Sequence, residues 1–181
     1  MPVGNLEFIK STSISAGVTT VDVDNVFSAD YDVYYCNIIG LYHNVDVSNG
    51  VEGLRLIDSG GSVISASEYD YATLNLKSYT TFSETRGTSD TRIWIGQITD
   101  QLADSGGANV GFYIFNPYDS SSYTFVTSQA SGRNTSESLA GSKGIGVHKS
   151  AETIRGFQLY ESNGARTFGG GTINVYGLAS N

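Results

Sequence analysis

The chain has 181 residues and a mass of 19.3 kDa, which is the size of one domain. Charged residues make up only 15% of it, against about 25% in an average globular chain. Roughly a third of the chain is Ser, Thr or Gly, and 12 Tyr and 8 Phe supply apolar mass for a core. This composition favours short strands joined by tight turns and disfavours a helical bundle, a coiled coil and a βαβ enzyme. The frequency of aromatic and β-branched residues argues against a disordered chain. We therefore predict one all-β domain over residues 1–181, with room for a short N-terminal arm at 1–5.

The charge and the single cysteine exclude several further classes. Ten basic and 18 acidic residues give a net charge of −8, and the Lys and Arg residues are scattered singly. A nucleic-acid partner requires a basic stripe that displaces counterions from phosphates, so none is expected. No apolar run reaches the roughly 18–20 residues of a membrane span, and the first residues show no signal-peptide pattern. Cys36 lies in an apolar stretch and is expected to be a buried small hydrophobe.

Strand-like runs follow one another along the chain. Residues 6–9 alternate, and in 20–24 the valines share one face and the aspartates the other. In residues 32–47, odd- and even-numbered positions are both apolar, as in a strand that is covered on both faces. In Tyr69–Leu76, the side chains of Ala72, Leu74 and Leu76 share one face. Further runs lie at 53–57, 62–65, 91–95, 110–115, 123–127, 154–160, 166–168 and 172–178.

Turn signals separate these runs at intervals of about 8–12 residues. Asn49–Gly50 and Asn163–Gly164 are the strongest hairpin signals, because both residue types accept positive φ. Two segments lack strand periodicity. Ser83–Asp90 is predicted to be a polar excursion, and Ser128–Lys143 either a functional loop or a mobile excursion. The only candidate helical turn is Ile98–Ala103. We predict about eight to ten short strands in an antiparallel, jelly-roll-like β-sandwich.

The sequence contains no catalytic or metal-binding signature. His43 and His148 stand far apart and outside any metal spacing, so each is expected to be structural or on the surface. The acidic segment 22–25 departs from a calcium loop, and Gly141–Gly146 lacks the pattern of a phosphate-binding loop. We therefore expect no enzyme activity, no cofactor and no metal.

Tyrosine is the most distinctive residue of the chain. Tyr suits strands, but it also supplies rigid contact area to protein interfaces and to sugar-stacking surfaces. Both readings remain open beside a purely structural one. The residues predicted to make such contacts are Tyr69, Tyr71, Tyr118 and Tyr123.

Both ends of the chain resemble a known group of proteins. Phe27–Tyr34, preceded by Leu6–Ile9, and the closing segment Phe168–Leu178 are similar to the first and last strands of small all-β virion proteins of tailed bacteriophages, especially marine ones. Gly53–Leu56 and Phe115–Tyr118 fit the same style. The resemblance implies a capsid decoration protein, or a module of a head fibre or tail fibre.

The predicted function is accordingly that of a non-enzymatic virion structural protein, made in the host cytoplasm and located in the virion. Its expected partners are further copies of itself, with a trimer favoured, and the major capsid or tail proteins of the particle. The alternative is a carbohydrate-binding module that recognises host surface glycans. A depolymerase-type hydrolase is the weaker rival, because it would usually need a longer chain.

Overall fold

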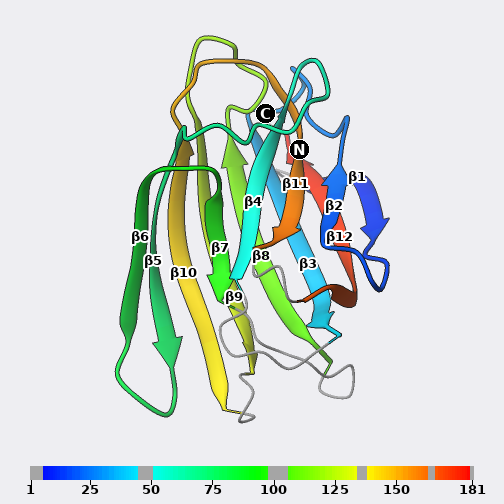
Figure 1. Ribbon diagram of the computed structural model, residues 1–181. Helices are drawn as coiled ribbons and strands as arrows, with labels where there is room; N and C mark the ends of the chain where they lie inside the picture. The colour runs from blue at the N-terminus through cyan, green and yellow to red at the C-terminus, as the bar shows by residue number, and fades with distance from the viewer. Residues whose placement is uncertain (1–5, 45–50, 98–105, 134–137, 163–165, 180–181) are drawn as a thin grey trace, which may run out of the picture.

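The computed structural model describes residues 6–44, 51–97, 106–133, 138–162 and 166–179, and shows twelve strands there (Figure 1). The arm at 1–5, both Asn-Gly signals and the candidate turn at 98–103 lie outside these residues. The strands are β1 (Leu6–Ser13), β2 (Thr20–Val23), β3 (Val33–His43), β4 (Val51–Asp58), β5 (Tyr69–Lys77), β6 (Ser83–Asp90), β7 (Ile93–Gln97), β8 (Ala108–Phe115), β9 (Thr124–Arg133), β10 (Leu139–His148), β11 (Ile154–Glu161) and β12 (Phe168–Leu178).

The strands form two antiparallel sheets, which confirms the predicted all-β sandwich. The large sheet has eight strands in the order β1-β12-β3-β8-β9-β10-β5-β6, and the small sheet has four in the order β2-β11-β4-β7. Figure 1 shows the small sheet lying over the middle of the large one, where β7 contacts β5, β9 and β10. The outer face of the large sheet is left uncovered by the described residues.

The core lies between the two sheets and follows the alternation of the strands. Val21 and Val23 of β2 are buried, while the intervening Asp22 is not, as the sequence pattern predicts. Phe112 of the large sheet meets Phe157 of the small sheet edge-to-face, with 5.5 Å between the ring centroids. Cys36 is fully buried, as expected, and burial raises the pKa of its thiol far above the ordinary value.

The prediction of a polar excursion at Ser83–Asp90 is wrong. This segment is β6, which pairs with β5 and ends the large sheet. An edge strand that the small sheet does not cover needs no apolar face, so its sequence carries no hydrophobic alternation. It brings the total to twelve strands instead of eight to ten.

The long loop predicted at Ser128–Lys143 is also largely wrong. Strand β9 continues to Arg133, and β10 begins at Leu139. The hydrophobic alternation of β10 is weak, because glycines occupy positions on its core-facing side where a strand normally carries apolar residues. A Cβ atom at Gly146 would lie 2.4 Å from Cγ2 of Ile93 in β7, so the close approach of the two sheets leaves no room for a side chain.

The described residues include no helix with the length and hydrophobicity of a membrane span.

Candidate functional site

A row of aromatic side chains crosses the outer face of the large sheet. The strand register sets Phe8 opposite Tyr176, Tyr176 opposite Tyr35, and Tyr35 opposite Tyr113. Their ring centroids are successively 5.7, 6.1 and 5.0 Å apart. We call these four residues the aromatic ladder. Cross-strand aromatic pairs of this kind stabilise a sheet, but here the rings also form a surface that is open to solvent.

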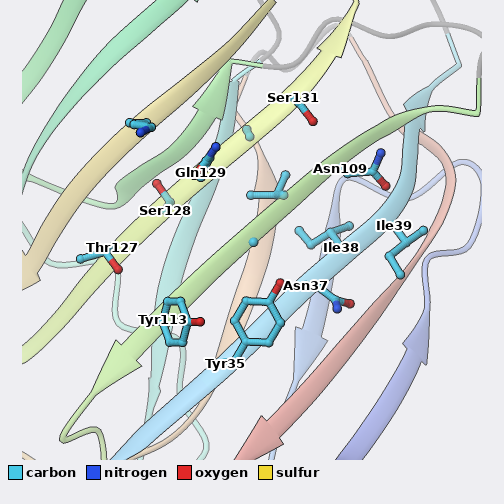
Figure 2. A pocket seen from close by; sticks show the side chains of 14 residues that line it. Tyr35, Asn37, Ile38, Ile39, Asn109, Tyr113, Thr127, Ser128, Gln129 and Ser131 are labelled. Carbon is cyan, nitrogen blue, oxygen red and sulfur yellow. The ribbon is translucent and has the colours of Figure 1, made fainter. Parts of the chain in front are cut away.

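A shallow groove of about 610 Å³ lies beside the ladder, above β3, β8, β9 and β10 (Figure 2). Tyr35 and Tyr113 stand next to each other along one side of it. Gly111 lies at its floor, and a Cβ atom there would be 3.0 Å from the hydroxyl oxygen of Tyr35. The absence of a side chain at position 111 therefore both hollows the sheet and lets the ring of Tyr35 lean over it. The lining residues are Tyr35, Asn37, Ile38, Ile39, Asn109, Val110, Gly111, Tyr113, Thr127, Ser128, Gln129, Ala130, Ser131 and Lys143.

Polar side chains occupy the next row of the sheet. Asn37 pairs with Gly111, Gly111 with Gln129, and Gln129 with Lys143, so the three polar groups lie in one line across the groove. Asn37 Oδ1 accepts a hydrogen bond from Asn174 Nδ2 at 3.0 Å, which fixes the orientation of its amide. Gln129 and Lys143 make no side-chain hydrogen bond within the described part of the chain, so their donors are available to a ligand.

The chemistry of the groove is that of binding. It combines an aromatic wall with amide, hydroxyl and ammonium groups, which is the composition of a ligand site that orients polar molecules. None of its lining residues is acidic or a histidine. It therefore does not hold the paired carboxylates of a glycosidase.

Two of the four tyrosines predicted as contact residues are placed in the core, which corrects that prediction. Tyr69 is fully buried; its hydroxyl donates to the carbonyl oxygen of Ile64 at 3.0 Å and accepts from the amide of Leu56 at 3.1 Å. Tyr71 is buried against Trp94, with parallel rings 5.8 Å apart. Tyr118 and Tyr123 are exposed in the β8–β9 connection, but they do not line the groove.

Tyr35 and Tyr113 are the functional candidates that the sequence reading missed. A signal for Tyr113 exists, because it stands between Phe112 and Ile114 in an apolar run and must therefore face away from them. Phe112 and Ile114 are fully buried, whereas Tyr113 is 41% exposed. A tyrosine that alternates with core residues along a strand is thus a better surface candidate than one chosen only because the chain is rich in tyrosine.

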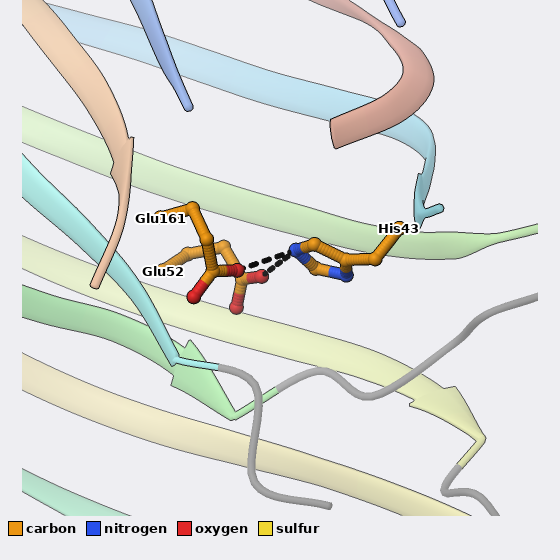
Figure 3. Close-up of side chains that lie close together, drawn as sticks. All are labelled: His43, Glu52 and Glu161. Carbon is orange, nitrogen blue, oxygen red and sulfur yellow. Dashed lines mark ion pairs between the residues drawn. The ribbon is translucent and has the colours of Figure 1, made fainter. Parts of the chain in front are cut away.

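Both histidines face carboxylates, and for both of them a surface position is wrong. His43 Nε2 lies 2.7 Å from Glu161 Oε2 and 3.0 Å from Glu52 Oε1 (Figure 3), and Arg166 Nη2 lies 2.6 Å from the same Glu161 oxygen. All four side chains are buried. We call them the buried ion cluster. His148 is equally buried and faces Glu68 and Glu152.

The electrostatics of the buried ion cluster are balanced. Burial alone would lower the pKa of His43, but hydrogen bonds to Glu161 and Glu52 outweigh it and raise that pKa to about 9. Burial raises the pKa of Glu52, and the hydrogen bond and charge of His43 oppose that rise. When both glutamates are ionised, a protonated His43 and Arg166 offset their charge. Although His43, Glu52 and Glu161 have the composition of a metal site, the guanidinium already supplies the cation that their charge requires. We assign the cluster a structural role.

Comparison with known proteins gives little. No family model matches the chain, and no curated protein is significantly similar to it. Among solved structures, the CBM2 module of the evolved Dit of Lactobacillus casei BL23 phage J-1 is 11% identical, with 94% of this chain and 69% of that chain covered and a TM-score of 0.25. A TM-score this low does not establish a common fold.

Proposed function

We propose that this protein is a non-enzymatic glycan-binding module that holds an oligosaccharide in the groove on the outer face of its large sheet. The observation that carries the proposal is the pairing of Tyr35 with Tyr113 beside a row of amides. A pyranose has one face of C–H bonds, which packs on an aromatic ring, and a rim of hydroxyl groups, which need hydrogen-bond partners. The groove offers both kinds of contact within one shallow surface.

The polar row gives the ligand further definition. Gln129 supplies an amide donor and acceptor, and Lys143 supplies three donors and a positive charge. No acidic residue lines the groove of a chain whose net charge is −8. Sugars that carry carboxylate or sulfate groups therefore meet no local repulsion there, and Lys143 attracts them.

The virion role remains a proposal that rests on the sequence resemblance. A particle that attaches to a host cell needs a surface that recognises cell-wall or capsular glycans. On this view the sandwich is carried by a phage virion, and the groove faces the host. A virion location and glycan binding are then two aspects of one function.

The decisive variant is Tyr113→Ala. Removal of an exposed ring on which a nucleic-acid base stacks costs about 1–3 kcal/mol. We expect a loss at the lower end of that range for a sugar, which is roughly tenfold weaker binding to the glycan that a glycan array identifies. The matched control is Tyr118→Ala, because Tyr118 is also 41% exposed but lies outside the groove. Equal affinities of both variants and the parent protein, measured by isothermal titration calorimetry, would place the binding elsewhere. A flat array would reject the proposal.

A second candidate function is assembly with further copies of the chain, and a specific surface favours it. Phe125 and Ile145 are 50% and 62% exposed and line a second groove of about 500 Å³ over β5, β9 and β10. A second copy that buries this apolar groove would be stabilised by the hydrophobic effect.

We expect the purified protein to be oligomeric at micromolar concentration, with a trimer favoured, in light scattering after size exclusion. Ile145→Lys places a charge on the apolar groove and should shift the mass toward 19.3 kDa. Lys is tolerated on an exposed strand position, so the fold should survive. A parent protein that is already monomeric would contradict this candidate and leave the glycan site untouched.

A further inference from the structure

A second histidine cluster lies at the opposite end of the sandwich from the buried ion cluster. His148 ends β10 and His43 ends β3, and the antiparallel order of the large sheet sends these two strands in opposite directions. His148 Nε2 lies 3.1 Å from Glu68 Oε2 and 3.8 Å from Glu152 Oε1. Glu68 and Glu152 are partly exposed, while the imidazole is fully buried. The cluster is therefore open to solvent on its carboxylate side.

Charge separates this cluster from the buried ion cluster. Within the described residues, the ion pairs of Glu68 and Glu152 are with His148 alone. The nearest lysine in sequence, Lys149, is held by Asp70 at 2.8 Å and donates to Ser89 Oγ. The two carboxylates together carry a charge of −2, and no guanidinium or ammonium group of the described residues forms an ion pair with either of them.

The imidazole is held in place by its surroundings. The ring of Tyr69 packs on His148, with 4.9 Å between the centroids. Tyr69 is itself fixed by its hydrogen bonds to Ile64 and Leu56. The amide of Lys149 donates to the carbonyl oxygen of Glu68 at 2.9 Å, which ties the start of β5 to the end of β10. An imidazole whose position is fixed by the fold loses little entropy when it binds an ion.

We propose that Glu68, His148 and Glu152 bind one divalent transition-metal ion of the zinc type. Two donors that each lie about 2.1 Å from a tetrahedral zinc are about 3.4 Å apart, and the 3.1 and 3.8 Å distances lie on either side of that value. One imidazole and two carboxylates form a borderline donor set that zinc accepts, with water as the fourth ligand. The ion offsets the charge of −2 and clamps β5, β10 and the β10–β11 connection together.

Zinc chloride titrated into the full chain, after dialysis against EDTA, tests the site by calorimetry. We expect one bound ion per chain and a raised melting temperature. Glu152→Gln keeps the shape of the side chain but loses a ligand, so it should weaken zinc binding by about tenfold or more. Because Glu152 is partly exposed, this variant should fold. The matched control, Glu84→Gln, changes an exposed glutamate of β6 outside the cluster and should bind zinc like the parent.

A spectroscopic measurement locates the ion. Cobalt(II) in place of zinc should give the visible absorption of a four-coordinate site, and Glu68→Gln should abolish it while Glu84→Gln should not. Absence of binding by the parent protein would overturn the proposal. So would zinc affinities that are unchanged in Glu68→Gln and Glu152→Gln, because the ion would then lie elsewhere.

Discussion

Replacement of Arg166 by Met should strongly destabilise the fold. The substitution removes the guanidinium that lies 2.6 Å from Glu161, so that His43 alone offsets the two carboxylates of the buried ion cluster. Breaking a buried ion pair from one side costs about 3–5 kcal/mol. We expect a loss of that size in the free energy of unfolding, measured with urea at pH 7, with the slope against denaturant unchanged.

The Arg155–Asp24 pair provides the matched control. Arg155 Nη2 lies 2.6 Å from Asp24 Oδ2, the same distance as in the buried pair, but both side chains are about a third exposed. Hydrogen bonding from Arg155 lowers the pKa of Asp24, yet an exposed ion pair contributes only about 0–1 kcal/mol. Arg155→Met should therefore cost far less than Arg166→Met. Similar losses for both variants would show that burial of Arg166 does not set its contribution.

A double variant separates the charge from the packing. Glu161→Gln in the Arg166→Met background removes the excess negative charge that the first change leaves in the buried ion cluster. Part of the lost stability should return, because a neutral amide is cheaper to bury than an unpaired carboxylate. Strict additivity of the two single changes would contradict an electrostatic coupling between Arg166 and Glu161.

Most of the fold could be predicted from the sequence, and its errors have a common cause. Strands such as β2 and β8 alternate because one of their faces lies in the core. Strand β6 carries no such signal because the small sheet does not cover it, and β10 hides its signal because glycine replaces apolar residues where β7 approaches. Hydrophobic periodicity identifies a strand that buries apolar side chains on one face. It therefore misses a strand that packs through glycines and a strand that is not covered by a second sheet.

The candidate site was less predictable, because the alternation of side chains along a strand does not show which of its two faces is buried. In β5, Ala72 and Leu74 share one face, as predicted, but both are exposed, and the opposite face carries Tyr69 and Tyr71 into the core. An exposed apolar face and a buried tyrosine face reverse the usual preference. The sequence also does not show which distant residues meet in space. His43, Glu52 and Glu161 belong to three different strands and meet only through the packing of both sheets.

The buried ion cluster should also make stability fall as the solution becomes alkaline. The pKa of His43 is about 9 in the folded protein and about 6.5 in an unfolded chain. A group whose pKa is raised by folding contributes fully below its unfolded value, and the contribution disappears as the pH rises through the folded value. We expect the free energy of unfolding to decrease by about 2 kcal/mol between pH 6.5 and 8.5.

Between pH 6.5 and 8.5, Cys36 and Tyr69 contribute little to the pH dependence of the free energy of unfolding. Burial raises the pKa values of Cys36 and Tyr69 in the folded protein, whereas their unfolded forms are half ionised near pH 8.5 and 10 respectively. Both groups therefore add their own decrease in stability mainly above this pH range, and Cys36 adds a few tenths of a kcal/mol at its upper limit. His43→Gln keeps a polar side chain beside Glu52 and Glu161 but has no proton to lose. Its unfolding free energy should be lower at pH 6.5 and nearly constant up to 8.5. A variant that keeps the slope of the parent protein would assign the pH dependence to groups outside the buried ion cluster.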